Sequence, residues 1–321
     1  MAWGVTRKRE VCHKERVSLN RHRGCLLGLA CGDAVGTTLE FRPRGSFEPI
    51  EDMVGGGPFH LKPGEWTDDT SMALCLGESL LEHGFDPRDQ MQRYVRWWRE
   101  GYLSSNGRCF DIGGTVSSAL AQFGRSDEPF AGSTSPDAAG NGSIMRLAPV
   151  ALYFSADEDA AVHHAGESSR TTHGCDEAVD ACRLLARVLA RALAGGPKDA
   201  VLAAGRDPEL QGHGDRPLAP AIAEIASGAW FGKGAHQVSG SGYVVQSLEA
   251  ALWCFAGTDS YRAAVLLAAN LGDDADTTAA IVGQIAGAFY GVEGIPPEWL
   301  AKLALRERIE EMAEALWVAA P

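Results

Sequence analysis

The 321-residue sequence lacks several patterns that would assign it to other classes of protein. No stretch of about 18 apolar residues occurs, so we expect no membrane-spanning helix, and the charged N-terminus lacks the apolar core of a secretory signal. The eight cysteines form no CxxC pair and no zinc-finger spacing, so we interpret them as reduced core thiols of a cytoplasmic protein. None of the nine histidines precedes an aspartate, which argues against a metal-dependent phosphohydrolase of the His-Asp type.

Positive charge is scarce over most of the chain. The sequence has 29 basic and 42 acidic residues, and from residue 24 onward 22 basic residues stand against 40 acidic ones. A field of this sign repels phosphate backbones and anionic lipids, so we expect neither general nucleic-acid binding nor membrane-surface binding. Residues 1–23 hold the other seven basic residues, and we expect them to form a flexible N-terminal arm. No linker divides residues 24–321, which we expect to form a single domain.

Apolar residues recur at helical spacing, whereas strand-like alternation is scarce. The first predicted helix covers residues 19–34, where Gly24, Gly28 and Gly32 would allow close contact with another helix. Further helices are predicted at residues 70–83, 87–99, 115–123, 157–168, 175–194, 218–227, 243–256, 258–269, 276–290 and 305–318. This pattern predicts an all-α bundle.

Two long connections are rich in glycine and proline, at residues 42–66 and 124–143, and cannot continue a helix. Loops of more than about 15 residues within a compact domain tend to be functional or disordered. Each of these loops leads directly into a cluster of polar residues. We therefore interpret both as functional loops.

Two clusters of acidic and hydroxyl residues each precede an apolar helical run. The first comprises Thr67, Asp68, Asp69 and Thr70, and the second comprises Asp273, Asp274, Asp276, Thr277 and Thr278. Capping of a helix N-terminus is one explanation, but capping needs only one or two oxygens. Five carboxylates packed together without a counterion would be costly, and oxygen-only ligands suit Mg²⁺ or Mn²⁺. Two such cations, about 3.5–4 Å apart, could share carboxylates.

Two further acidic residues lie between the first predicted helix and the first long loop. Asp33 follows the packed helix, and we interpret it as a helix cap or a buried hydrogen-bonding group rather than a metal ligand. Glu40 stands at the entrance to the loop, where it would be free to act as a mobile acid, base or ligand.

Five segments of the sequence together resemble the ADP-ribosylglycohydrolase family, which includes the dinitrogenase reductase-activating glycohydrolase and the animal ADP-ribosylhydrolases. They are GCLLGLACGDAVGTTLEF (24–41), WTDDTSMAL (66–74), CFDIGGT (109–115), GNGSIMRLAPVAL (140–152) and GDDADTTAAIVGQIAGAFYG (272–291). The resemblance runs from about Gly24 to Trp317. It implies an all-α orthogonal helical bundle, a single catalytic domain, with a dinuclear Mg²⁺ or Mn²⁺ centre at the bottom of an ADP-ribose cleft.

The resemblance also implies roles for individual residues. The metal ligands would be Thr67, Asp68, Asp69, Asp274, Asp276 and Thr277, with Asp273, a position that is commonly glycine in this pattern, behind them. The catalytic residues would be Glu40, Asp69 and Asp111, with Asp111 on the side of the substrate guanidinium. Substrate would be bound by Asn141, Gly142 and Ser143 around the ribose and diphosphate, by His173 near the diphosphate and by Tyr243 at the adenine.

Several of these roles have plainer alternatives. A plain Asn-Gly turn would account for residues 141–142, and a structural histidine for His173. Tyr243 could be a core tyrosine, and Asp111 could fix its own loop in an Asx turn.

The function implied is removal of ADP-ribose from a modified arginine, by attack of water at C1″ of the ribose. Glu40 would give a proton to the leaving guanidine or take one from water, and ADP-ribose would be the product. The alternatives are hydrolysis of serine-linked ADP-ribose, O-acetyl-ADP-ribose or an ADP-ribosylated nucleobase. A non-catalytic member of the family, of the kind reused as a lens crystallin, is a further alternative.

Overall fold

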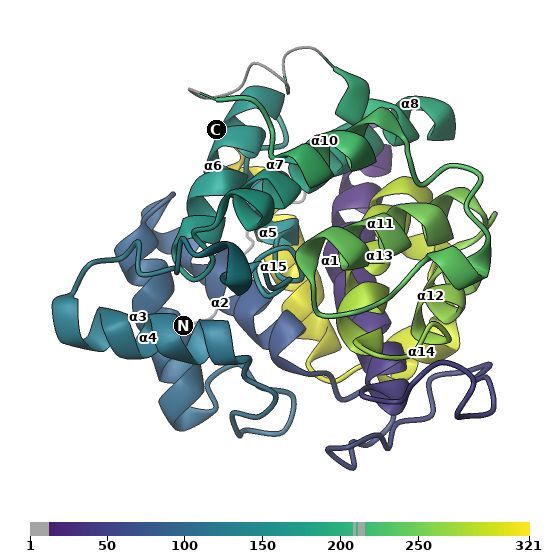
Figure 1. Cartoon of the computed structure of the whole chain (residues 1–321), viewed down its shortest axis with the longest axis horizontal. Helices are drawn as coiled ribbons and strands as arrows, with labels where there is room; N and C mark the ends of the chain where they lie inside the picture. Colours follow the sequence, from purple (N-terminus) through teal and green to yellow (C-terminus); the bar gives the residue numbers. More distant parts are fainter. Residues whose placement is uncertain (1–12, 208–209, 211–215) are drawn as a thin grey trace.

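The computed structural model describes residues 13–207, 210 and 216–321, and this part of the chain is all-α, as predicted. No β-strand occurs in it, and isolated β-bridges join loops only. The helices cross one another in several directions, as expected for an orthogonal bundle (Figure 1). The α-helices are α1 (His13–Gly36), α2 (Asp68–His83), α3 (Pro87–Glu100), α4 (Gly114–Ser126), α5 (Ala148–Tyr153), α6 (Glu158–Arg170), α7 (Asp176–Leu193), α8 (Lys198–Leu202), α10 (Pro220–Ser227), α11 (Val244–Ala256), α12 (Tyr261–Ala269), α13 (Ala275–Tyr290), α14 (Pro297–Lys302) and α15 (Arg306–Ala319).

Helices α1 and α13 lie side by side with their backbones in contact (Figure 1). A Cβ atom added to Gly28 would lie 2.4 Å from the carbonyl oxygen of Gly283. A Cβ atom added to Gly32 would lie 2.2 Å from the carbonyl oxygen of Ala279. The predicted role of the glycine spacing, close contact with another helix, is therefore confirmed. Because α1 leads to Glu40 and α13 begins at the second acidic cluster, this contact fixes two parts of the site relative to each other.

The first helix begins earlier than the sequence predicted. Residues 13–23, which we expected in a flexible arm, form the N-terminal part of α1. The guanidinium of Arg21 donates to the carbonyl of Ala288, in the last turn of α13, at 3.1 Å. Arg23 pairs with two carboxylates of α15. These two cations therefore hold helices together, while the rest of the expected arm, residues 1–12, lies outside the described residues.

Helix ends follow local chemistry where the sequence supplies it. The carboxylate of Asp86 accepts the backbone N–H groups of Arg88 and Asp89, at 2.9 and 3.2 Å, and so caps α3. Gly101 ends the same helix at φ 66°, in the left-handed region that glycine adopts readily. The short helices α8 and α14 were not predicted, because five or six residues carry too little periodicity to recognise.

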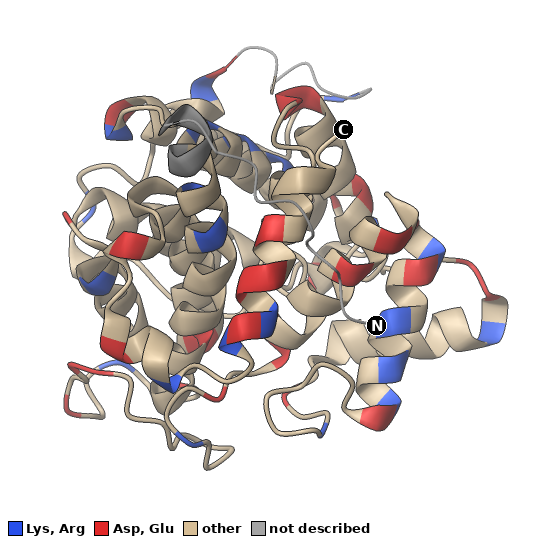
Figure 2. Cartoon of the chain, turned by 180° about the vertical axis from the view of Figure 1, so that it is seen from behind, with Lys and Arg blue, Asp and Glu red and all other residues tan. Residues whose placement is uncertain are grey.

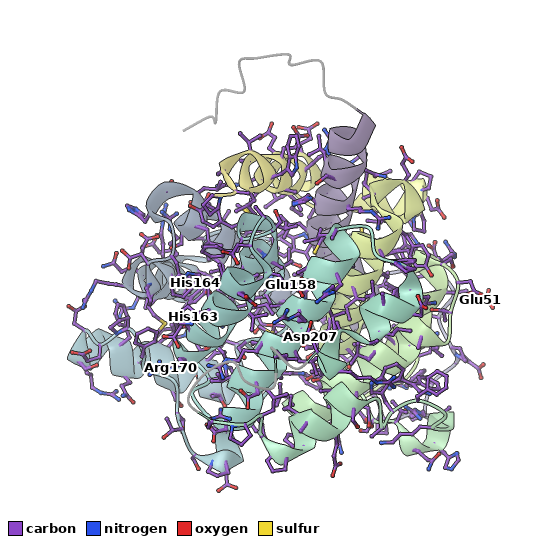
Figure 3. The ribbon with its side chains drawn as sticks, turned by 90° about the horizontal axis from the view of Figure 1, so that it is seen from above. Glu51, Glu158, His163, His164, Arg170 and Asp207 are labelled. Atoms are coloured by element: carbon purple, nitrogen blue, oxygen red, sulfur yellow. The ribbon has the colours of Figure 1, made fainter. Side chains whose placement is uncertain are left out.

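Acidic and basic residues are interspersed along the helices and loops of the chain (Figure 2). Glu158 at the start of α6 lies 3.0 Å from a guanidinium nitrogen of Arg187 and 2.8 Å from one of Arg191. Asp207 contacts the same two arginines, at 3.7 and 2.7 Å, and lies near Glu158 in Figure 3. These carboxylates have cationic partners and join α6, α7 and the segment after α8.

The cysteines agree with their interpretation as core thiols. All seven within the described residues are free, and six of them are buried, whereas Cys109 is half-buried. Cys12 lies outside the described residues. Over the described ranges, no helix has both the length and the apolar character needed to cross a membrane.

Candidate active site

The two acidic clusters meet where the N-termini of α2 and α13 face each other. The hydroxyl oxygen of Thr67 lies 3.2 Å from a carboxylate oxygen of Asp276. The hydroxyl of Thr277 lies 3.4 Å from a carboxylate oxygen of Asp69. Neither Thr67 nor Asp274 caps its own helix through its side chain. Helix capping therefore does not explain why these oxygens gather here.

Asp33 supplies the cap that α2 lacks. Its carboxylate, on α1, accepts the backbone N–H groups of Thr67 and Thr70 at 2.8 and 3.1 Å, and the Thr70 hydroxyl at 2.6 Å. Burial raises the pKa of Asp33 to about 6, although these hydrogen bonds favour the ionised form. Asp33 therefore has the role expected of it, a buried hydrogen-bonding group that joins α1 to the first cluster.

Glu40 and Asp111 lie beside the second cluster. A carboxylate oxygen from each of Glu40, Asp111 and Asp276 lies within 4.8 Å of the other two, a spacing that suits a bound metal ion. Glu40 follows the short 3₁₀-helix η1 (Thr37–Leu39), and its exposed fraction is 3%. The sequence suggested a mobile glutamate, whereas the structure buries Glu40 in the wall of the site.

Backbone hydrogen bonds explain why Glu40 is held there. The N–H of Phe41 donates to the carbonyl of Asp273 at 2.7 Å, and the N–H of Asp273 donates to the carbonyl of Arg42 at 2.8 Å. Asp273 has φ 57°, the left-handed region, and is itself exposed. Its part in the site is thus a backbone turn that fastens the first long loop to the start of α13.

Burial among like charges perturbs these carboxyl groups strongly. Burial, reinforced by the charge of Asp111, raises the pKa of Glu40 to about 10. Burial likewise raises the pKa of Asp111 to about 7, although hydrogen bonding to Glu40 opposes the shift. Burial and neighbouring carboxylates also raise the pKa of Asp68, Asp69 and Asp276 well above the usual range.

The carboxylates of the site lack cationic partners among the described residues. No lysine, arginine or histidine within the described ranges forms an ion pair with them. One buried carboxylate oxygen each of Glu40, Asp69 and Asp276 has no hydrogen-bond partner among the described residues. Unpaired buried oxygens are costly. An oxygen-only donor set with unsatisfied atoms fits a hard divalent cation.

A cavity of about 340 Å³ lies against the carboxylates, a size typical of small-molecule sites. It is lined by Glu40, Phe41, Asp68, Asp111, Ile112, Gly113, Gly114, Thr115, Val116, Gly140, Asn141, Gly142, Met145, His173, Gly242, Asp274, Asp276 and Thr277. Asn141 joins the cavity wall to the second cluster, because its side-chain N–H donates to Asp274 at 2.8 Å. Thr67 and Asp69 are buried behind this wall.

His173 and Arg146 support the small-residue side of the cavity. Burial, together with the nearby Arg146 charge, lowers the pKa of His173 to about 3, so the imidazole is neutral at physiological pH. The fully buried guanidinium of Arg146 donates to the carbonyl of Gly142 at 3.1 Å and to the Thr172 hydroxyl at 2.8 Å. The structure thus holds the Asn141–Gly142 turn from behind with a buried cation.

Two residues expected to contact substrate do not line this cavity. The hydroxyl of Ser143 is buried and accepts hydrogen bonds from Ser169 at 2.9 Å and from the Cys182 thiol at 3.4 Å. The hydroxyl of Tyr243 donates to Glu177 at 2.7 Å, so this ring is fixed at the surface beside the lining residue Gly242. The other residues named from the sequence lie in the cavity wall or directly behind it.

Several residues of the cavity wall and its support were not assigned a role from the sequence, and Phe41 and Arg146 are the two whose chemistry bears on the site. Phe41 lines the cavity, and its place beside Glu40 in the printed motif was the available signal. Arg146 was detectable as the only charged residue within the apolar run of residues 144–152.

Known proteins are similar to this chain in sequence and in fold. The model of the ADP-ribosylglycohydrolase family matches residues 15–321. The chain is 48% identical over 305 residues to the ADP-ribosylarginine hydrolase Tri1 of Pseudomonas putida strain GB-1, covering 95% of this chain and 80% of that protein. It is 31% identical over 315 residues to the ADP-ribosyl-[dinitrogen reductase] glycohydrolase of Rhodospirillum rubrum, covering 92% and 95% of the two chains. A solved structure, an ADP-ribosylglycohydrolase-related protein complex, matches with a TM-score of 0.84 and 42% identity, covering 95% of this chain and all of the other.

Proposed function

The chain belongs to the ADP-ribosylglycohydrolase family, and on this premise we propose that it is an ADP-ribosylarginine hydrolase. It would cleave the N-glycosidic bond between C1″ of ADP-ribose and the guanidine of a modified arginine in a protein, releasing ADP-ribose. The observation that carries the proposal is the convergence of carboxylates from Glu40, Asp111, α2 and α13 on one cavity. Relatives at 48% and 44% identity that are named ADP-ribosylarginine hydrolases support the arginine linkage.

We further propose that the site holds two divalent cations, Mg²⁺ or Mn²⁺. The ligands would come from Thr67, Asp68, Asp69, Asp274, Asp276 and Thr277, with Glu40 and Asp111 within reach of Asp276. When bound, the cations would supply Lewis-acid activation of water and would offset the charge of the carboxylates. The unsatisfied buried oxygens of Asp69 and Asp276 support this assignment.

The remaining roles belong to residues of the chain itself. Glu40 would transfer a proton to the leaving guanidine nitrogen, because its carboxyl group lies in the cavity wall and retains a proton easily. Asp111 would accept N–H groups of the guanidinium. The backbone N–H of Gly142 would bind the diphosphate, because the N–H of Asn141 already donates to the carbonyl of Gly242 at 3.1 Å. Neutral His173 would support this turn, Ser143 would hold it, and Tyr243 would stand at the rim near the adenine.

We also propose a single catalytic domain that acts in the cytoplasm on ADP-ribosylated proteins, without general nucleic-acid or membrane binding. The free cysteines of the described residues support a reducing compartment. The excess of 42 acidic over 29 basic residues disfavours polyanionic partners.

Release of ADP-ribose from defined linkages tests the proposal. The protein is incubated in Mg²⁺ buffer with arginine-linked, serine-linked and O-acetyl-linked ADP-ribose, and free ADP-ribose is quantified over time. We expect the fastest release from the arginine linkage. Faster release from serine or O-acetyl substrates would reassign the substrate, and release from none of the three would overturn the hydrolase assignment.

A further inference from the structure

Three phenylalanines from separate segments gather beside the carboxylates. The ring centroids of Phe41 and Phe59 are 6.4 Å apart in an edge-to-face arrangement, and those of Phe59 and Phe110 are 5.1 Å apart. Phe41 lines the cavity although 65% of it is exposed. An exposed aromatic ring in a cavity wall forgoes the stabilisation that burial would provide, which suggests that a ligand covers it.

Two of these phenylalanines are neighbours in sequence of acidic residues of the site. Phe41 follows Glu40 and has φ 59°, and Phe110 precedes Asp111, which has φ 62°. The left-handed conformation is unfavourable for a residue other than glycine and tends to occur where function requires a fixed direction. Glu40, Phe41 and Asp111 therefore line the cavity from constrained pieces of backbone, and Phe110 supports the Phe41 ring indirectly, through Phe59.

An aromatic ring beside a carboxylate favours a ligand that is flat and positively charged. The face of an aromatic ring and a carboxylate both attract a cation, and a planar guanidinium can stack on the ring while it donates to the carboxylate. The cavity lining contains no lysine or arginine among the described residues, so nothing cationic competes there. A neutral serine oxygen or acetyl group would gain little from the same surface.

We propose that Phe41, backed by Phe59 and Phe110, forms the subsite for the acceptor side chain and determines the preference for arginine linkages. The guanidinium of the modified arginine stacks on the Phe41 ring while Asp111 accepts its N–H groups. This inference rests on the proposed function, because it assigns the arginine side chain of that substrate to a surface.

The variant Phe41→Leu tests the subsite. Leucine fills a similar volume and meets the same backbone constraint, but it has no aromatic face. We expect kcat/KM for ADP-ribosylarginine to fall about tenfold, as loss of a partly desolvated cation–π contact predicts. Inhibition by the product ADP-ribose should stay within about twofold of wild type, because ADP-ribose lacks the guanidinium. Phe41→Tyr, which keeps an aromatic face, should lose much less kcat/KM than Phe41→Leu.

Phe231→Leu is the matched control, because Phe231 is 76% exposed and does not line the cavity. It should leave every parameter unchanged. If Phe41→Leu hydrolyses ADP-ribosylarginine as fast as wild type, the subsite is wrong and the proposed function stands. A parallel loss of affinity for ADP-ribose would also overturn the subsite, because Phe41 would then contact the ADP-ribose part of the substrate rather than the arginine side chain. Failure of the wild-type protein itself on arginine linkages would instead overturn the proposed function, and the subsite with it.

Discussion

At the scale of single residues, Glu40 combines burial with a charged neighbourhood. Its carboxyl group is buried next to Asp111, and this raises its pKa to about 10, so without bound cations it retains its proton at neutral pH. A cation near Asp276 would counter that shift and bring the pKa toward the range useful for proton transfer. A group poised in this way suits an acid that protonates a leaving nitrogen.

Replacing Glu40 with glutamine should therefore remove proton transfer while keeping the shape of the side chain. We expect kcat for ADP-ribosylarginine to fall by at least about 100-fold in Glu40→Gln. The Kd for ADP-ribose, measured by calorimetry, should change less than about threefold. Glu48→Gln is the control, because Glu48 is exposed in the same loop. A Glu40→Gln enzyme with a normal kcat would remove Glu40 from the mechanism.

The sequence motifs identified most of the cavity wall but could not orient every side chain. Ser143 adjoins Gly142 in the motif, yet its hydroxyl turns toward Ser169, which is distant in sequence. Arg146 supports the same turn from the core, and its guanidinium is held there by the hydroxyls of Thr171 and Thr172, which are distant in sequence. Local spacing predicts which residues share a loop, whereas tertiary packing decides which of them faces the ligand.

At the scale of secondary structure, the contact between α1 and α13 positions the site. Glycines let the two backbones touch, so the segment carrying Glu40 and the helix beginning beside Asp274 are fixed relative to each other. Helical periodicity predicted the long helices correctly. It could not predict that α1 extends back to His13, because residues 13–18 contain one apolar residue and therefore no helical periodicity.

A methyl group at Gly32 should disrupt this contact. The added Cβ would lie 2.2 Å from the Ala279 carbonyl oxygen, so the helices would have to separate. We expect Gly32→Ala to lower the free energy of unfolding by about 2–3 kcal/mol, measured by urea denaturation, and to reduce activity as well.

Gly124→Ala is the matched control in an exposed position of α4, where the nearest atom to an added Cβ is a guanidinium nitrogen of Arg99 at 4.0 Å. This variant should be neutral or more stable by up to about 1 kcal/mol, because alanine favours the helix. Equal stability of Gly32→Ala and wild type would contradict the assigned role of the α1–α13 contact.

At the scale of the whole molecule, the acidic site links stability to pH. The pKa values of Asp111 and Glu40, about 7 and about 10, lie above the values near 4 expected in the unfolded chain. The folded, metal-free protein therefore binds more protons than the unfolded chain above about pH 4. Its free energy of unfolding receives a contribution from these groups that decreases as pH rises toward their folded pKa values.

Divalent cations should offset this decrease in the free energy of unfolding at high pH, because they bind the ionised carboxylates. We expect Mn²⁺ to raise Tm by about 5 °C at pH 8, relative to protein in chelator, when its concentration is about 100-fold above Kd. At pH 5, where protons compete, the increase should be much smaller. Differential scanning calorimetry at both pH values measures it. A shift that is equal at both pH values would show that the metal binds elsewhere.

The central claim is that carboxylates from both acidic clusters form one cation-dependent hydrolase site. The most direct measurement follows ADP-ribose release from ADP-ribosylarginine by chelator-treated protein before and after Mn²⁺ is added back. We predict that wild type and Asp259→Asn, an exposed control, are inactive in chelator and recover with Mn²⁺. Asp276→Asn should remain at least about 100-fold slower after the addition. Full release in chelator, or full recovery of Asp276→Asn, would contradict the account.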